Sequence, residues 1–344
     1  MTVPFEGWPA VLGELAARRD LTTDQARGAM SEVLEGAASS AQIAGFVVAL
    51  RIKGESVAEL DGMLQAMLDA AEHVQLPEGA PVVDVVGTGG DRAHTINVST
   101  LSALVLAGAG GRVCKHGNRA ASSSAGSADV LEALGVRIDC GPDGVARCVA
   151  EAGIGFCFAP RYHSAMRHAG PVRRELGIPT AFNILGPLAN PAGATRLMIG
   201  VADATMAERM AGVLAARGAD RALIVHGDDG LDELTISTTS HVVELVDGQV
   251  RGYEVDPTAL GIERAPAESV VGGDPATNAA LARRVLDGEH GPHRDIVSLN
   301  AAAALVTAGL ADDLATGIDA ARAAIDDGRA AATLDRLVAV SNEA

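Results

Sequence analysis

The sequence predicts an α/β protein in which a small N-terminal helical lobe is hinged to a large domain with a central, mostly parallel sheet flanked by helices. Short apolar, β-branched runs recur from residue 82 onward and are separated by stretches of helical periodicity. The residues before them show only helical patterns. Aromatic residues make up 2% of the chain, so the core must consist of Ala, Val, Leu and Ile, which suits packed helices and a buried parallel sheet.

The helical lobe is expected to cover residues 1–76. Three helix-capping patterns follow one another in it, namely Thr22 with Gln25, Ser39 with Gln42, and Ser56 with Glu59. Apolar residues follow each pattern at helical spacing, and Gly36 and Gly54 stand where helices are expected to end. Because so small a bundle has little core of its own, we expect it to pack against the rest of the chain or against a second subunit.

The large domain is expected to cover residues 80–344 and to be joined to the lobe by a helical crossover near residues 170–192. Its predicted strands are the apolar runs Val82–Val86, Arg112–Cys114, Ile154–Phe158, Leu197–Val201 and Ala222–Val225. Two further runs, Val242–Val246 and Val250–Val255, are joined through Asp247-Gly248 and predict a hairpin added to the sheet. From Asn278 to the C-terminus the pattern is mostly helical.

Composition and charge argue against several classes of protein. The formal net charge of −17 opposes a general nucleic-acid or anionic-membrane surface, and the scarcity of aromatics removes stacking platforms for single-stranded nucleic acid. The four cysteines lack CxxC spacing, which favours buried thiols in a reducing compartment. We see neither a signal peptide nor a run near the ~18 apolar residues of a membrane span. We therefore expect a cytoplasmic protein.

The first candidate ligand loop, Gly87–Asp91, directly follows a predicted strand. Ligands bind at the carboxyl ends of parallel strands, and glycines let backbone N–H groups approach an anion closely. Small polar side chains then lead into a helix predicted over Leu101–Ala109, and such side chains at a helix N-terminus suit phosphate. The alternative is a tight turn with an ordinary helix cap, because the loop matches neither the dinucleotide nor the Walker A pattern.

The second candidate loop, Lys115–Ser127, follows the predicted strand Arg112–Cys114 and leads into another predicted helix. Besides the cations Lys115 and Arg119 it holds an amide and four hydroxyl groups. A solvated Ser/Gly linker is the alternative, but a linker needs no basic residues placed directly after an apolar strand. The loop therefore favours anion binding.

An acidic segment, His226–Glu233, follows the predicted strand Ala222–Val225. Its carboxylates would repel a phosphate unless Mg²⁺ lay between them, and Mg²⁺ prefers hard oxygen ligands. A solvated acidic turn is the alternative, but two phosphate loops elsewhere in the sheet make a metal site the better interpretation. Arg173, in the crossover, could bind a substrate carboxylate with both arms of its guanidinium, although a surface arginine is the simpler alternative.

Five motifs occur in a fixed order along the chain: GTGGD, NVST, KHGNRAASS with GSADVLEALG, FNILGPLANP and GDDGLDEL. In this order and over essentially the whole length, the chain resembles the anthranilate phosphoribosyltransferase family. The resemblance implies a glycosyltransferase (pentosyltransferase) that converts anthranilate and 5-phosphoribosyl 1-diphosphate into N-(5-phosphoribosyl)anthranilate and pyrophosphate, the second step of tryptophan biosynthesis from chorismate. It also implies Mg²⁺, with two ions per active site, and a homodimer that contacts through the helical lobes.

Carried over by position, the resemblance implies three sets of ligands. The residues expected around phosphoribosyl diphosphate are Gly87, Gly90, Asp91, Thr95, Asn97, Ser99, Thr100, Lys115, Ser122, Ser123 and Ser127. Those expected at anthranilate are Gly87, His116, Asn118 and Arg173, and those expected at Mg²⁺ are Ser99, Asp232 and Glu233. Lys115, Asp91 and Asn118 are the expected catalytic residues.

The implied chemistry agrees with these residue types. Pyrophosphate leaves the ribose most easily when Mg²⁺, Lys115 and backbone donors neutralise its charge. The sugar then gains oxocarbenium-like character and the aromatic amine attacks it. Because an aniline nitrogen is unprotonated at neutral pH, no strong base is required. The expected task of the protein is orientation and electrostatic stabilisation.

The chain departs from the family at one place, and two rival functions remain. Where the family commonly continues GTGGD with Gly, a variable residue and Asn, this chain has Arg92-Ala93-His94, which puts the local backbone shape and substrate affinity in question. A pyrimidine-nucleoside phosphorylase shares the fold and a related lysine–serine loop, but Asp232-Glu233 and FNILGPLANP favour the transferase. A non-catalytic nucleic-acid-binding relative would need a basic surface, which the net charge opposes.

Overall fold

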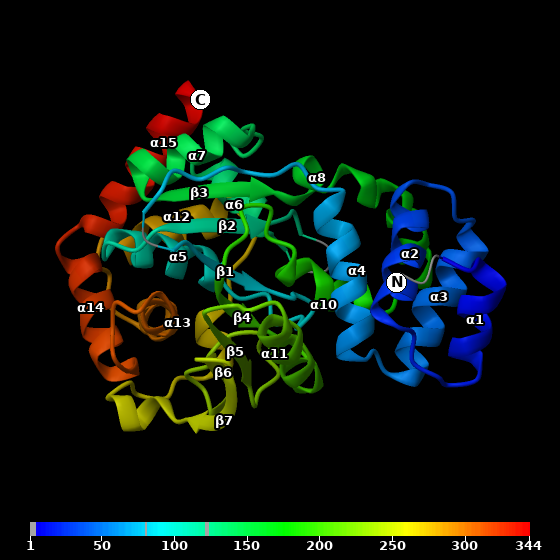
Figure 1. Ribbon diagram of the computed structural model, residues 1–344. Helices are drawn as coiled ribbons and strands as arrows, with labels where there is room; N and C mark the ends of the chain where they lie inside the picture. The colour runs from blue at the N-terminus through cyan, green and yellow to red at the C-terminus, as the bar shows by residue number, and fades with distance from the viewer. Residues whose placement is uncertain (1–4, 80, 121–123) are drawn as a thin grey trace.

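A helical lobe stands beside a larger α/β domain in the structure (Figure 1), a computed structural model that describes residues 5–79, 81–120 and 124–344. The lobe consists of α1 (Trp8–Ala16), α2 (Thr23–Leu34), α3 (Ser40–Lys53) and α4 (Val57–Asp69). This arrangement confirms the predicted fold class. Among the described residues, none of the helices combines the length and apolar character needed to cross a membrane.

Three helices of the lobe begin at the predicted capping patterns. The side-chain oxygens of Thr22, Ser39 and Ser56 each accept a hydrogen bond from the backbone N–H three residues on. The side chain of that later residue accepts a hydrogen bond from the backbone N–H of the capping residue. Gly36 and Gly54, just beyond the ends of α2 and α3, have φ angles of 75° and 89°. Glycine adopts these left-handed values without a Cβ clash, so both residues end their helices as predicted.

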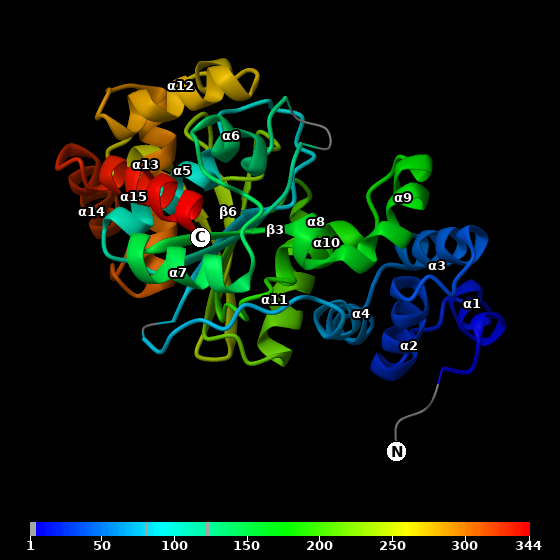
Figure 2. The ribbon, with the colours of Figure 1, turned by 90° about the horizontal axis from the view of Figure 1, so that it is seen from above.

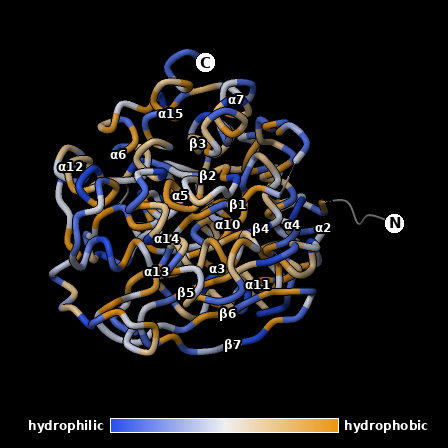
Figure 3. The backbone as a smooth tube through the Cα atoms, turned by 90° about the vertical axis from the view of Figure 1, so that its left-hand side faces the viewer, coloured by the Kyte–Doolittle hydropathy of each residue, from blue (hydrophilic) through white to orange (hydrophobic). Residues whose placement is uncertain are grey.

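The sheet has seven strands in the order β3-β2-β1-β4-β5-β6-β7. Their bounds are β1 (Val83–Gly87), β2 (Val113–Gly117), β3 (Ile154–Phe158), β4 (Arg196–Gly200), β5 (Arg221–Gly227), β6 (Ser240–Val246) and β7 (Gln249–Val255). The first five in spatial order are parallel, whereas β6 and β7 form the predicted hairpin and pair antiparallel. The edge strand β7 is largely exposed and mostly hydrophilic (Figure 3).

Strand β2 is longer than predicted, since it runs on to Gly117 instead of ending at Cys114. Lys115 and His116 are therefore strand residues paired with β3, and both side chains are buried. The apolar pattern stops at Cys114, so the sequence offers no hydrophobic signal for this extension. Similarly α5 (Val98–Gly108) begins before the predicted Leu101, which places Ser99 in its first turn.

Helices cover both faces of the sheet (Figures 1 and 2). One face packs against α5, α13 (Pro292–Ala308) and α15 (Arg329–Glu343), and α12 (Pro275–Leu286) and α14 (Leu314–Asp326) pack on these helices. The other packs against α10 (Ala181–Leu188) and α11 (Ala207–Ala216), while α6 (Ser127–Ala133), α7 (Pro142–Ala152) and α8 (Ala159–Tyr162) lie around β2 and β3. Alternate residues of β1 divide between the two faces, with Val85 in one apolar cluster and Val86 in the other.

The described residues of the lobe form no separate core. Its buried residues join α10, α11 and one face of the sheet in a single apolar cluster, which also holds residues of α9 (Gly170–Leu176). Helix α4 contacts α10 and α11, while α3 contacts α9 and α10. The lobe therefore packs against the rest of the chain, one of the two outcomes that its small size predicts.

Candidate active site

The candidate active site lies at the carboxyl ends of β1, β4 and β5. Gly87 and Gly200 end neighbouring strands β1 and β4 and are partners in register. The acidic segment after β5 lies across both ends: a Cβ on Gly200 would lie 1.6 Å from the carbonyl oxygen of Asp232, and one on Gly87 would lie 2.6 Å from its Oδ2. No other residue fits at either strand end, because any side chain there would displace Asp232.

Asp232 also fixes the glycine loop. The backbone N–H of Gly89 donates to its Oδ2 at 2.7 Å. Gly89 and Gly90 have φ angles of 65° and 89°, so the loop turns through backbone conformations that favour glycine. Thr88 ties the loop to the next strand, since its N–H donates to the carbonyl of Gly200 at 2.9 Å. The loop is thus held from two sides.

A buried cation lies under this loop. Lys115 is 2% exposed, and its Nζ lies 3.3 Å from Oγ of Ser99 and also donates to the carbonyl of Val85. Oε1 of Glu233 accepts from the backbone N–H of Ser99 at 3.1 Å. Burial lowers the pKa of Lys115, and the charges of Asp84 and Glu233 oppose that shift. An anion bound nearby would keep this lysine charged.

The pKa values of two carboxyl groups in the site, Asp232 and Glu233, are raised. Burial raises the pKa of Asp232 to about 8, and the nearby charge of Asp91 adds to the shift. Burial and the charge of Asp232 likewise raise the pKa of Glu233. A cation placed among these groups would lower both pKa values.

The donor set fits Mg²⁺ only together with a substrate. In the described ranges no group of three or more acidic, histidine or cysteine side chains is placed to hold a metal by itself. Mg²⁺ usually keeps water and takes one or two protein carboxylates together with substrate phosphates. Asp232, Glu233 and the hydroxyl of Ser99 offer such a partial set of hard oxygen ligands.

The other acidic residues of this segment stabilise the turn itself. Oδ2 of Asp229 accepts from Thr235 at 2.7 Å and from Ser237, and Asp228 accepts from Thr239. Only the last two carboxylates of the predicted acidic segment, those of Asp232 and Glu233, take part in the contacts with the glycine loop and α5 described above.

The expected phosphoribosyl-diphosphate residues differ in their surroundings. Asn97 donates to the carbonyl of Ala125 at 3.0 Å and accepts from Asn278 at 2.9 Å. Its side-chain amide therefore links the start of α5 to the second loop and to α12. The side chain of Thr100 is buried, and its hydroxyl has no hydrogen-bond partner in the described part of the chain. Ser127 Oγ donates to the carbonyl of Asn118 at 3.3 Å.

The remaining members of that set lie in two parts of the sequence. Gly90 and Asp91 belong to the glycine loop, and Thr95 forms an isolated bridge with Val271. Ser122 and Ser123 lie outside the described residues.

The expected anthranilate residues come from three parts of the chain, namely the ends of β1 and β2 and helix α9. Arg173 lies on α9, with its guanidinium 5.0 Å from the ring centre of Phe182, and within the described residues it has no carboxylate partner. Burial lowers its pKa. A half-buried, unpaired guanidinium beside an aromatic ring suits an aromatic carboxylate. Asn118 lies at the end of β2, where its Oδ1 accepts from the N–H of Arg119 at 2.8 Å.

His116 lies in β2 next to Lys115. Its ring centre is 5.1 Å from that of His163, and its Nε2 is buried without a partner among the described residues. Burial and the neighbouring His163 lower the pKa of His116 to about 3, so the imidazole is neutral.

The two cations of the second loop, Lys115 and Arg119, lie in different surroundings. Arg119 pairs with Asp129 and Glu132, both at 2.8 Å, and stacks over Phe158 at 5.6 Å. It therefore fixes the loop to α6, and Lys115 is the cation that lies under the glycine loop.

Three positioning residues were not predicted from the sequence. Asn190, the last Asn of FNILGPLANP, donates to Asp84 at 2.7 Å and to the carbonyl of Cys114 at 2.8 Å. Asp84 also accepts from the N–H of His116 at 3.0 Å. Asn300 on α13 exchanges two 2.9 Å hydrogen bonds with the backbone of Leu234. A carboxylate inside an apolar strand, as at Asp84, was the signal that could have found the first two.

The residues at the family departure adopt unusual backbone conformations. Arg92 and His94 have φ angles of 59° and 52°, in the left-handed region. Gly and Asn, which the family commonly has there, adopt this region most readily. The side chain of His94 bridges to the second loop, with Nδ1 3.2 Å from Oγ of Ser124.

Comparison with known proteins places these features in a family. Residues 79–331 match the family described as "Glycosyl transferase family, a/b domain", and residues 9–71 match "Glycosyl transferase family, helical bundle domain". The anthranilate phosphoribosyltransferase of Salinispora arenicola is 55% identical over 342 residues, which cover 97% of each chain.

Solved structures agree with this match. That of anthranilate phosphoribosyltransferase from Thermus thermophilus is 44% identical, with a TM-score of 0.91 over 96% of this chain and 99% of that one. That of the Saccharomyces cerevisiae enzyme in complex with PRPP and Mg is 26% identical, with a TM-score of 0.89 over 98% of each chain. The two rival functions find no support in these relatives, and the chain belongs to the anthranilate phosphoribosyltransferase family.

Proposed function

We propose that this chain transfers the phosphoribosyl group of 5-phosphoribosyl 1-diphosphate to the amino group of anthranilate, in the second step of tryptophan biosynthesis from chorismate. The observation that carries the proposal is the cluster of Lys115, Ser99 and Glu233 beneath the glycine loop. It combines a buried cation, a hydroxyl and a carboxylate where a diphosphate and its cation would bind. The similarity to anthranilate phosphoribosyltransferases supports the choice of substrates.

In the proposed reaction the bond between ribose C1 and the diphosphate oxygen breaks, a bond from C1 to the amine nitrogen forms, and the amine releases a proton. Lys115 and the N–H groups of the loop Gly87–Asp91 stabilise the charge on the leaving pyrophosphate. Arg173 binds the carboxylate of anthranilate and so orients its amine towards C1. Asn118 and the neutral His116 line the anthranilate pocket, and Asp91 faces the diphosphate.

Mg²⁺ would be held by Ser99, Asp232 and Glu233, together with phosphate oxygens, and we propose two ions per active site. When bound, it neutralises charge on the departing pyrophosphate. The raised pKa values of Asp232 and Glu233 support a cation at this place. The remaining proposed phosphoribosyl-diphosphate ligands are Gly87, Gly90, Thr95, Asn97, Thr100, Ser122, Ser123 and Ser127.

The proposal extends to the organisation of the protein. We assign residues 1–76 to the helical lobe and 80–344 to the α/β domain, with the crossover near 170–192 between them. Helix α1 lies on the side of the lobe away from the sheet (Figure 1), and we propose that side for the homodimer contact. The four cysteines are buried thiols, in keeping with a cytoplasmic protein.

The loss of anthranilate fluorescence tests the function directly. We expect it to be consumed only when phosphoribosyl diphosphate and Mg²⁺ are both present, with pyrophosphate formed in equal amount. Phosphorolysis of thymidine or uridine and salt-sensitive DNA binding serve as negative controls. An unchanged anthranilate signal in the complete mixture would overturn the proposal.

A further inference from the structure

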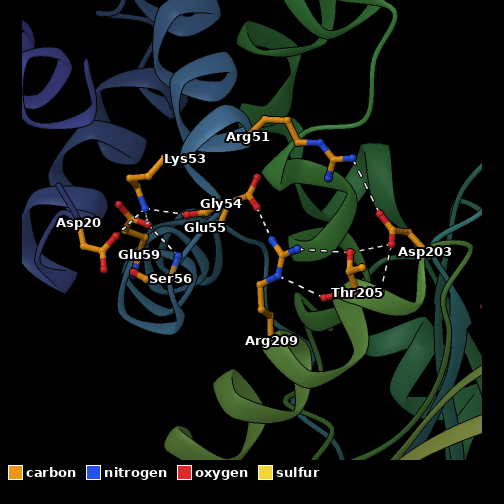
Figure 4. A network of polar contacts seen from close by, with 10 residues as sticks. All are labelled: Asp20, Arg51, Lys53, Gly54, Glu55, Ser56, Glu59, Asp203, Thr205 and Arg209. Carbon is orange, nitrogen blue, oxygen red and sulfur yellow. Dashed lines mark hydrogen bonds and ion pairs between the residues drawn. The ribbon is translucent and has the colours of Figure 1, made fainter. Parts of the chain in front are cut away.

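A buried ion pair joins the helical lobe to the α/β domain (Figure 4). Glu55, in the turn between α3 and α4, accepts from Nη1 of Arg209 on α11 at 2.6 Å. The Glu55 side chain is 1% exposed, and its Oε1 has no hydrogen-bond partner within the described residues. A buried carboxylate with a single charged partner depends strongly on that partner.

The turn that carries Glu55 is fixed within the lobe. Nζ of Lys53 donates to Asp20 at 2.6 Å, to Glu59 at 2.9 Å and to the carbonyl of Gly54 at 2.7 Å (Figure 4). These contacts hold the turn on both sides of Glu55. Movement of the lobe therefore moves Glu55 with it.

On the other side of the interface Arg209 holds the segment that follows β4. Its Nε donates to the carbonyl of Thr205 at 3.2 Å, and its Nη2 donates to the hydroxyl of Thr205 at 3.4 Å. That hydroxyl donates to Asp203 at 2.6 Å, and Asp203 lies 3.8 Å from Arg51 of α3. Two arginines thus cross the interface in opposite directions and meet at the segment Asp203–Thr205 (Figure 4).

This segment is directly connected to the glycine loop. The backbone N–H of Ala202, next to Asp203, donates to Oγ1 of Thr88 at 3.1 Å. Thr88 lies between Gly87 and Gly89. On the lobe side, α3 contacts α9, the helix of Arg173. The network therefore joins α9, which holds Arg173, to the glycine loop.

We propose that Arg209 is a positioning residue, which sets the placement of Arg173 relative to the glycine loop by linking Glu55 to the segment Asp203–Thr205. It belongs to none of the ligand sets proposed above. The kinetic part of this inference rests on the proposed function, whereas the mechanical part does not. A contact that serves stability alone would affect unfolding but leave substrate affinity unchanged.

The same helix supplies a matched control. Arg217, at the other end of α11, pairs with Asp61 of α4 at 2.8 Å and donates to Gln65 at 3.0 Å. This pair also crosses from α11 to the lobe, and the Arg217 side chain is about as exposed as that of Arg209 (26% and 27%). It lies at the end of the helix remote from the segment after β4. Arg217→Gln thus removes an arginine of similar exposure from the same interface without touching the link, while its partner Asp61 is more exposed than Glu55 (28% against 1%).

The test compares Arg209→Gln, Glu55→Gln, their double variant and Arg217→Gln. We expect Arg209→Gln to lower kcat/KM for anthranilate by about 10- to 100-fold through misplacement of the substrate, and to raise KM. Arg217→Gln should keep wild-type KM. The double variant should show the same kinetic loss as Arg209→Gln but recover thermal stability, since no unpaired buried charge is left.

Hydrogen exchange of the substrate-free protein tests the mechanical part independently of turnover. Arg209→Gln should speed exchange at 86–91 and 199–205, and Arg217→Gln should not. Equal kinetic effects of the two substitutions, or a lowered Tm with unchanged KM and unchanged exchange for Arg209→Gln, would overturn the inference. If the wild type turned over no anthranilate while the exchange difference persisted, the proposed function would fail and the link would stand.

Discussion

Ser99 and Glu233 are joined directly, with the backbone N–H of Ser99 donating to the glutamate carboxylate at 3.1 Å across 134 residues of sequence. The hydroxyl of the same serine lies 3.3 Å from Nζ of Lys115. The first turn of α5, the strand β2 and the acidic segment after β5 therefore meet at one serine. A change at any of the three should affect the same function.

Removing one charge from this cluster should strongly slow magnesium-dependent turnover. Glu233→Gln keeps the size of the side chain and an acceptor for the N–H of Ser99, so the fold should survive. We expect kcat to fall by about 10²–10³-fold, because charge stabilisation at the leaving group is lost. Turnover measured against Mg²⁺ concentration checks this. Asp228→Asn, in the same segment but bonded to Thr239, should stay near wild type, and an equal loss there would contradict the assignment.

A methyl group at the end of β1 should also reduce activity. Gly87→Ala places a Cβ 2.6 Å from Oδ2 of Asp232, so either the carboxylate or the glycine loop must move. We expect a loss of at least about tenfold in kcat/KM for phosphoribosyl diphosphate. Gly13→Ala in α1 meets no atom within 4 Å and should stabilise its helix by up to ~1 kcal/mol. Steady-state kinetics and thermal unfolding of both variants separate the two effects.

Much of this fold could be predicted from local patterns. The capping residues Thr22, Ser39 and Ser56 sit where their helices begin, and the run Ile154–Phe158 is a strand with the predicted bounds. These features depend on contacts within a few residues or on apolar runs, which a sequence displays directly. Lys115 shows the limit, since its burial in β2 depends on partners elsewhere in the sheet.

The supporting contacts of the site could not be predicted. Asn190 and Asp84 are 106 residues apart, and neither belongs to a pattern that names the other. Their pairing follows from the sheet order, which brings the segment before β4 against β1 and β2. The bond of Asp232 to Gly89 likewise exists only because β5 ends beside the neighbouring strands.

The left-handed backbone at Arg92 should cost stability that glycine would recover. Arg92→Gly relieves a φ of 59° but makes the unfolded chain more flexible, so we expect a net gain of at most ~1 kcal/mol in the free energy of unfolding. Gly89→Ala is the reverse test: its Cβ would meet nothing within 4 Å, so any loss comes from its φ of 65°. Denaturant unfolding measures both. A clear destabilisation by Arg92→Gly would show that the arginine side chain makes a stabilising contact.

The buried His116 should make the substrate-free protein sensitive to acid. Its pKa is about 3 in the folded protein and about 6.5 when unfolded, so only the unfolded state gains a proton between these values. The stability that neutral His116 contributes is complete above pH 6.5 and is lost as the pH falls, by about 2 kcal/mol at pH 5. The difference between the unfolding free energies at pH 5 and pH 7 should be about 2 kcal/mol smaller in His116→Asn than in the wild type. An unchanged difference in His116→Asn would contradict the assigned burial of a neutral imidazole.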